Sequence, residues 1–252
     1  MYYIMDTNIW VEVTQGRISC DELAGKGGAR VVVAPFMIVE LMKATVKSGG
    51  RFFLNDKATF TCMAKFDILE LTKVFIFKAL WGLSDAGVSK VRPETYRALL
   101  QMIIGSSSFA DFIAKTEGPG SEWKRVCDWD SIHEGVLDKE LRAVGKLADR
   151  ASLRTIHVHV ARLYRLGGLL PDPDVLEQKF SAALEYLRSS VVKVRKGANL
   201  AKKDPGMYVD FQLFFYLADP EAVVVSYEKF SGEIVRSPQR SRIITFDQFR
   251  RL

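Results

Sequence analysis

Short apolar runs that are typical of buried strands lie at both ends of this 252-residue chain. Two lie near the N-terminus, at Tyr2–Met5 and Val31–Ala34, and two near the C-terminus, at Ala222–Ser226 and Ile243–Phe246. Strands of this kind that are separated by helices are typical of α/β proteins. The two ends are therefore predicted to meet in one sheet of a split α/β domain.

The middle of the chain has a different pattern. From about residue 53 to residue 200 the apolar residues recur at spacings of three and four, which is typical of amphipathic helices. Two of these helices are marked by Leu141, Val144 and Leu147, and by Phe180, Leu184, Leu187 and Val191. We predict an α/β domain made of residues 1–50 and 200–252, with a mainly helical insert at residues 51–199.

Basic residues outnumber acidic ones, with 36 Lys and Arg against 30 Asp and Glu and a formal net charge of +6. Positive charge favours polyanionic partners by speeding encounter and by releasing counterions. A basic stretch runs from Lys193 to Lys203, and Arg236, Arg240 and Arg242 form a second one. The charge fits a nucleic-acid partner without identifying one.

The three cysteines, Cys20, Cys62 and Cys127, lie far apart and include no C-x-x-C pair. The odd count and the spacing argue against a disulfide framework and a zinc site, so buried, reduced thiols are predicted. The N-terminus lacks a basic and apolar leader, and no apolar run approaches the ~20 residues of a membrane span. We predict a cytoplasmic protein with no membrane partner.

Four acidic residues follow predicted strands or lie in the helices after them: Asp6, Glu40, Asp210 and Glu228. Open α/β sheets bind ligands at the carboxyl ends of their strands. Clustered carboxylates repel one another unless a cation lies between them. Because oxygen ligands without His or Cys favour Mg²⁺ or Mn²⁺, which bind phosphate and activate water, the pattern indicates phosphodiester hydrolysis.

Four segments, in this order, resemble the motifs of the PIN-domain ribonucleases. The first is Ile4–Asn8, a hydrophobic strand followed by Asp-Thr-Asn, and the second is Pro35–Leu41, with a Glu before its last residue. The third is Asp210–Ala218, an acid that leads an apolar helix, and the fourth is Val223–Phe230, a strand that runs into Ser-Tyr-Glu. The resemblance covers roughly the first 50 and the last 50 residues.

The resemblance implies a PIN-like α/β fold with a central parallel sheet flanked by helices. It also implies a metal-dependent endoribonuclease, in which a metal-activated water hydrolyses the RNA phosphodiester bond. The acids that it implies as both catalytic and metal-binding, with Mg²⁺ or Mn²⁺, are Asp6, Glu40, Asp210 and Glu228. By the same resemblance, Asn8 and Ser226 would orient ligands or water. Glu228 stands where the family usually has Asp, and its extra methylene changes the reach of the carboxylate toward Mg²⁺, which demands near-octahedral geometry.

Several alternatives stay open at this point. Asp6 is also an ordinary helix-capping residue, and Asp210 would suit the first turn of any helix. A PIN-like domain with a decayed site would be an RNA- or protein-binding module, and the same pocket would serve a metal-dependent DNA nuclease. If the resemblance extends to biology, the chain is a toxin restrained by an antitoxin, or an RNA-processing or defence nuclease; a homodimer is a further alternative.

Overall fold

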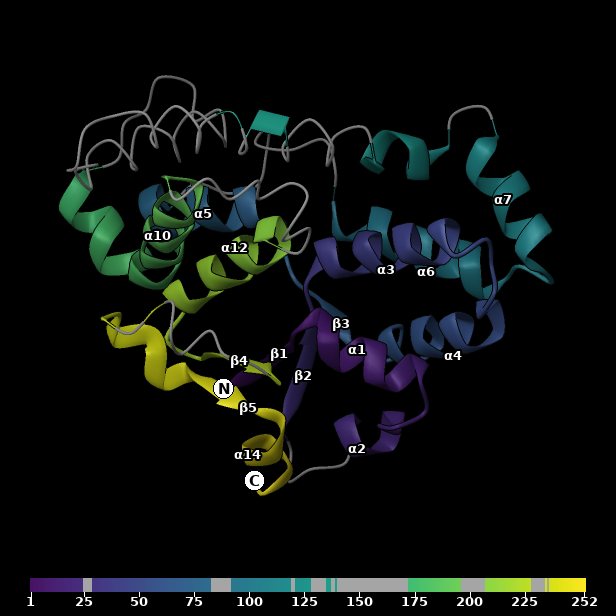
Figure 1. Ribbon diagram of the computed structural model, residues 1–252, viewed down its shortest axis with the longest axis horizontal. Helices are drawn as coiled ribbons and strands as arrows, with labels where there is room; N and C mark the ends of the chain where they lie inside the picture. The colour runs from purple at the N-terminus through teal and green to yellow at the C-terminus, as the bar shows by residue number, and fades with distance from the viewer. Residues whose placement is uncertain are drawn as a thin grey trace.

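A five-stranded, all-parallel sheet lies at the centre of the computed structural model (Figure 1). The structure describes residues 1–24, 29–82, 92–118, 121–127, 135–136, 139, 172–195, 207–227, 234 and 236–252. The strands are β1 (Tyr2–Met5), β2 (Arg30–Val33), β3 (Asp67–Ile68), β4 (Ala222–Ser226) and β5 (Ile243–Thr245). Their spatial order is β3-β2-β1-β4-β5, so β1 lies at the centre and pairs with both β2 and β4.

The central strands are apolar because both of their faces are covered. All residues of β1 and β4 are buried, and β2 is buried after its first residue. The two edge strands are shorter and partly exposed. From β1 the chain builds outward through β2 and β3, then returns to the other side of β1 to form β4 and β5. The direction of winding therefore reverses between β1 and β4.

The helices form two groups beside the sheet, which Figure 1 shows on the right and toward the upper left of the molecule. The first group is α1 (Thr7–Thr14), α3 (Pro35–Lys47), α4 (Phe53–Met63), α6 (Pro93–Ile104) and α7 (Phe109–Glu117). The second is α5 (Thr72–Trp81), α10 (Pro173–Arg195), α12 (Met207–Phe215) and the 3-10 helix η1 (Tyr216–Ala218). Shorter helices are α2 (Cys20–Ala24), η2 (Pro238–Arg242) and α14 (Phe246–Arg250).

Both chain ends contribute to the sheet, as the sequence predicted. The strands expected at Tyr2–Met5 and Ala222–Ser226 have those bounds, and Pro35 is the first residue of α3. The C-terminal helix α14 packs back on β1, where the rings of Phe249 and Tyr3 meet edge to face with centroids 5.2 Å apart. This confirms the α/β fold with a parallel sheet.

The sheet also includes a strand from the span that was predicted to be a helical insert. β3 lies within residues 51–199 and pairs with β2, with Val32 opposite Asp67. A strand of two residues is too short to show an apolar pattern, and Asp67 at its start is exposed. The helix predicted around Phe180–Val191 lies within α10, whereas the one predicted at Leu141–Leu147 is outside the described residues.

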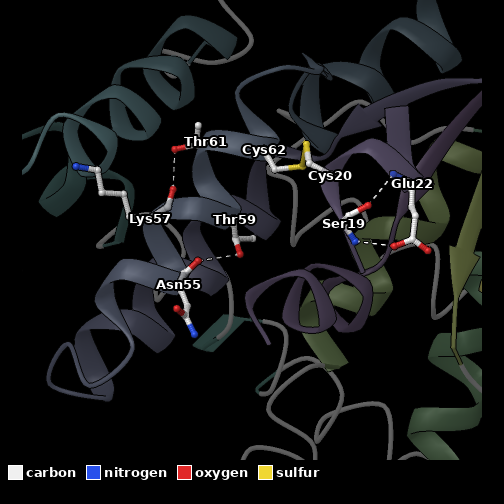
Figure 2. The surroundings of a disulfide bond; sticks show 8 residues. All are labelled: Ser19, Cys20, Glu22, Asn55, Lys57, Thr59, Thr61 and Cys62. Carbon is white, nitrogen blue, oxygen red and sulfur yellow. Dashed lines mark hydrogen bonds between the residues drawn. A yellow bond between two sulfur atoms is a disulfide. The ribbon is translucent and has the colours of Figure 1, made fainter. Parts of the chain in front are cut away.

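The prediction of reduced thiols is wrong for two of the three cysteines. Cys20, at the start of α2, and Cys62, in the last turn of α4, form a disulfide with their Cα atoms 5.6 Å apart (Figure 2). The fold brings them together across 42 positions of sequence, a proximity that spacing alone does not reveal. Disulfides are more common in oxidising compartments, so this bond does not support the predicted cytoplasmic location.

None of the described helices is long and apolar enough to span a membrane.

Gly50, in the turn between α3 and α4, is held in a conformation that only glycine adopts easily. Its φ is +73°, and a Cβ built on it would lie 2.2 Å from Cγ of Phe109. Phe109 cannot move away freely because its ring packs against Phe53 and Phe112. We expect Gly50→Ala to lower the free energy of unfolding by about 2–3 kcal/mol, from left-handed strain plus overpacking, as measured by denaturant titration.

Gly49 provides the matched control for this substitution. Its φ is +65°, but a Cβ there would meet no atom within 4 Å. Gly49→Ala should therefore show the conformational penalty alone, about 1 kcal/mol. Equal losses in the two variants would contradict the packing role of Phe109 against Gly50.

Candidate functional site

Asp6 lies where open α/β sheets form their ligand-binding crevices. It directly follows β1, and its backbone N–H donates to the carbonyl of Val225 in β4 at 2.9 Å. The carboxyl ends of β1 and β4 therefore lie side by side at the point where the winding of the sheet reverses. In open α/β sheets such a reversal separates the loops that follow the two strands, and ligands generally bind there.

Three hydrogen bonds fix the Asp6 carboxylate. Oδ1 accepts from the backbone N–H of Thr7 at 2.7 Å, and Oδ2 accepts from Ser226 Oγ at 2.8 Å and from Asn8 Nδ2 at 3.3 Å. Asp6 is thus the N-cap of α1, which confirms the capping interpretation. Capping does not exclude a second role, because the carboxylate faces β4 as well as its own helix.

Burial makes the charge of Asp6 costly. The residue is 1% exposed, and desolvation raises the pKa of its carboxyl group although the three hydrogen bonds act to lower it. In the part of the chain that the structure describes, no basic side chain forms an ion pair with this carboxylate. A cation from solution would therefore be a favourable partner for Asp6.

Thr7 links Asp6 to the second predicted acid, Glu40. Its hydroxyl donates to Oε2 of Glu40 at 2.5 Å, while its backbone N–H donates to Asp6. Glu40 is half-buried in the middle of α3, whose buried residues are all apolar except Thr45. The fold therefore links these two acids through Thr7, the first residue of α1. We name Asp6, Thr7, Glu40 and Ser226 the Asp6 site.

Asp210 is anchored by a different element. It lies in the first turn of α12, and its Oδ2 accepts from the hydroxyl of Tyr186 in α10 at 3.0 Å. The helix begins at Met207, three residues earlier than the sequence predicted. Since α12 packs against α3, which carries Glu40, the third acid lies on an element next to the Asp6 site.

The remaining predicted residues have distinct placements. Ser226 is buried at the end of β4 and donates to Asp6, whereas Asn8 is exposed on α1 and makes the longest of the three bonds to Asp6. Glu228 lies outside the described residues. Within those residues, no group of three or more Asp, Glu, His or Cys side chains is close enough to hold a metal ion.

Two residues of this region were not predicted as site residues. Thr7 is part of the Asp-Thr-Asn motif but is not among the predicted site residues, although its hydroxyl donates to Glu40. Tyr186 occupies a core position of α10 and is 1% exposed, so its sequence pattern is that of an ordinary helix core residue. Only the spatial proximity of α10 and α12 reveals its contact with Asp210.

The structure gives side-chain contacts for the second basic segment but not for the first. The guanidinium of Arg242 donates to the backbone carbonyls of Leu217, Asp219 and Ala222, which ties η2 to the start of β4. This arginine therefore has a structural role. The side chains of the basic stretch from Lys193 to Lys203 lie outside the described residues.

Comparison with family models, with curated proteins and with solved structures returns no match to this chain. The resemblance to the PIN-domain ribonucleases therefore rests on the sequence motifs alone.

Proposed function

We propose that this protein is a metal-dependent nuclease that hydrolyses RNA at the Asp6 site. The observation that supports this most is the buried carboxylate of Asp6, which lies between the carboxyl ends of β1 and β4 without a basic partner among the described residues. A buried carboxylate of this kind is destabilising unless a cation compensates for it. The net charge of +6 favours a polyanionic substrate.

The residues of the Asp6 site fit Mg²⁺ or Mn²⁺ by chemistry. Both ions prefer carboxylate oxygen, and Mg²⁺ commonly keeps several waters while binding one or two protein carboxylates plus substrate phosphate. Asp6 and Glu40 would supply those carboxylates, with Asp210 and Glu228 as further acids. When bound, the ion would stabilise phosphate charge and lower the pKa of water.

The protein's own contribution is to orient these acids before substrate arrives. Ser226 and the N–H of Thr7 hold the two oxygens of Asp6, and the hydroxyl of Thr7 holds Glu40. Tyr186 restrains Asp210 in the same way. Carboxylates held by hydrogen bonds need little rearrangement when they bind a cation, which is how such sites gain affinity and rate.

A binding module with a decayed site is the second candidate. It is favoured by the finding that the described acids do not form a group of three. A protein of this kind would bind RNA without cutting it. A metal-dependent DNA nuclease, and the restraint of this chain by an antitoxin, remain predictions from the resemblance alone.

The test is a cleavage assay with single-stranded RNA, structured RNA and single-stranded DNA, in Mg²⁺ or Mn²⁺ and in EDTA. We expect RNA cleavage that EDTA abolishes and that the double variant Asp6→Asn, Asp210→Asn lowers at least about 100-fold, since metal ligands contribute several kcal/mol to the transition state. Asp174→Asn, at an exposed position of α10, is the matched control and should cut at the wild-type rate.

The other outcomes of this assay separate the alternatives. RNA binding without cleavage would favour the binding module, and cleavage of DNA alone would favour the DNA nuclease. Cleavage that survives EDTA or the double substitution would mean that the Asp6 site does not perform the reaction.

A further inference from the structure

A cavity of about 570 Å³ lies between α1, α3 and α4, and none of the Asp6 site residues lines it. Its volume is in the range of small-molecule binding sites. The apolar part of the lining is Val11, Leu41, Ala44, Phe52 and Phe60. An apolar body of modest size would therefore bury hydrophobic surface there.

The hydroxyl groups of the cavity offer acceptors rather than donors. Those of Thr14, Thr45, Ser48 and Thr59 all line it. Each donates to a backbone carbonyl three or four residues earlier, at 3.2, 3.0, 2.9 and 3.2 Å in that order; Figure 2 shows the bond from Thr59 to Asn55. A hydroxyl has one proton and two lone pairs, so these groups present lone pairs to a ligand.

Two neighbouring contacts leave this conclusion unchanged. Thr14 Oγ1 and Thr59 Oγ1 lie 2.8 Å apart, so either hydroxyl can use its proton on the other instead of on a carbonyl. The Thr45 hydroxyl also interacts with the carboxyl group of Asp56 and acts to lower the pKa of that group. In each case the proton is used within the protein, and the ligand must bring the donor.

The carboxylate of Asp56 gives the cavity its charge. Asp56 lines it from the first turn of α4, and burial raises the pKa of its carboxyl group, against the opposing hydrogen bond from Thr45. No basic side chain in the described ranges forms an ion pair with Asp56. A half-buried carboxylate beside acceptor oxygens favours a positively charged donor.

The nearby cations do not supply that charge. Arg17, the basic residue of the lining, donates to both oxygens of Glu12 at 2.9 and 3.0 Å, so its charge is neutralised. The guanidinium of Arg51 lies 5.2 Å from the centroid of the Phe52 ring, and Arg51 does not line the cavity. That contact shows that Phe52 accepts a cation on its ring.

We propose that this cavity binds a small organic ammonium compound, with its protonated amine at Asp56 and the threonine hydroxyls and its apolar body against Leu41 and Phe60. The amine supplies donors to the lone pairs of these hydroxyls, and its charge compensates for the carboxylate. The binding does not depend on the proposed nuclease activity, because the cavity and the Asp6 site share no residue.

The proposal is tested by calorimetric titration of the full chain with phenethylammonium chloride and with 2-phenylethanol, its uncharged counterpart. The ammonium compound is expected to bind at least about tenfold more tightly than the alcohol, as a single charge-assisted hydrogen bond would give. Asp56→Asn should weaken binding of the ammonium at least about tenfold, and Asp174→Asn, which removes the same charge from an exposed position, should leave it unchanged.

Thr45→Val is a second variant, since it removes one acceptor and keeps the shape of the side chain. It should weaken binding of the ammonium compound. Circular dichroism with thermal melting will show that each variant is folded. Equal affinity for the ammonium and the alcohol, no measurable binding of either, or full affinity in a folded Asp56→Asn protein would each overturn the proposal.

Discussion

Asp6→Asn is expected to make the protein more stable at neutral pH while lowering RNA cleavage at least about 100-fold. Asparagine caps a helix as well as aspartate does, its oxygen can accept the N–H of Thr7, and Ser226 can turn its hydroxyl to accept from the new amide. The buried charge disappears, so the gain should be about 1–2 kcal/mol. Denaturant titration at pH 7 measures the gain, and the cleavage assay measures the loss.

The pH dependence of this gain follows from the direction of the pKa shift. Because burial raises the pKa of Asp6, the folded state holds the proton more tightly than the unfolded chain does. The contribution of Asp6 to the unfolding free energy of the wild type therefore decreases as pH rises from the ordinary aspartate range, about pH 4, through the folded pKa. The advantage of Asp6→Asn should be largest above that window and should shrink as the pH falls through it.

Metal ions provide a readout that capping alone would not change. If Asp6 holds Mg²⁺ or Mn²⁺, the ion stabilises the folded wild type by mass action and should raise its melting temperature. The Asp6→Asn protein should show a smaller rise in melting temperature, and the Asp174→Asn protein should show the same rise as the wild type. A protein that loses stability on Asp6→Asn and shows no metal-dependent rise would indicate a cap without a metal-binding role.

The sheet is predictable from the sequence because its central strands are covered on both faces. β1 and β4 are continuous apolar runs for that reason, and they are recognisable without any knowledge of their partners. β3 was missed because it is a two-residue edge strand that is specified by pairing with β2 rather than by its own side chains. The start of α12 was misplaced because Met207 to Val209 continue the helix before its acid.

The candidate site was also only partly predictable from the sequence, for a similar physical reason. Asp6 and Glu40 are visible in the sequence because a polar group follows a buried strand or interrupts an apolar helix. The contacts that hold them are long-range: Ser226 reaches Asp6 across 220 positions, and Thr7 reaches Glu40 across 33. Which hydroxyl meets which carboxylate is decided by the order of the strands, and no local pattern encodes it.

The Cys20–Cys62 disulfide closes the part of the chain that contains β2 and α3. The loop spans 42 positions and includes Glu40 of the Asp6 site. Cross-linking acts mainly on the unfolded chain, whose conformational entropy it reduces, and in the chain-entropy model a loop of this length contributes about 4 kcal/mol. The native contacts of Glu40 do not require the bond, because the hydroxyl of Thr7 holds that side chain.

Replacing both residues, in Cys20→Ala, Cys62→Ala, is expected to lower the free energy of unfolding by about 4 kcal/mol. The less compact unfolded chain should also show a larger dependence of stability on denaturant concentration. Reduced wild-type protein should behave like the double variant, and Cys127→Ala, at the cysteine outside the disulfide, should not. Denaturant titration with and without reductant measures all three.

Titration of the reactive thiols shows whether the disulfide is the cause of this stability difference. Unfolded but unreduced protein should present one reactive thiol per chain, against three after reduction, because Cys20 and Cys62 are joined and Cys127 is not. Since the disulfide acts on the unfolded state, the double variant should retain the wild-type cleavage rate at temperatures where it remains folded. Two results would show that the fold is held by its core alone. One is three reactive thiols before reduction, and the other is a double variant as stable as the wild type. In that case, α2 and α4 would be held in place by their own buried residues, such as Leu23 in α2 and Phe60 in α4, and not by the covalent link.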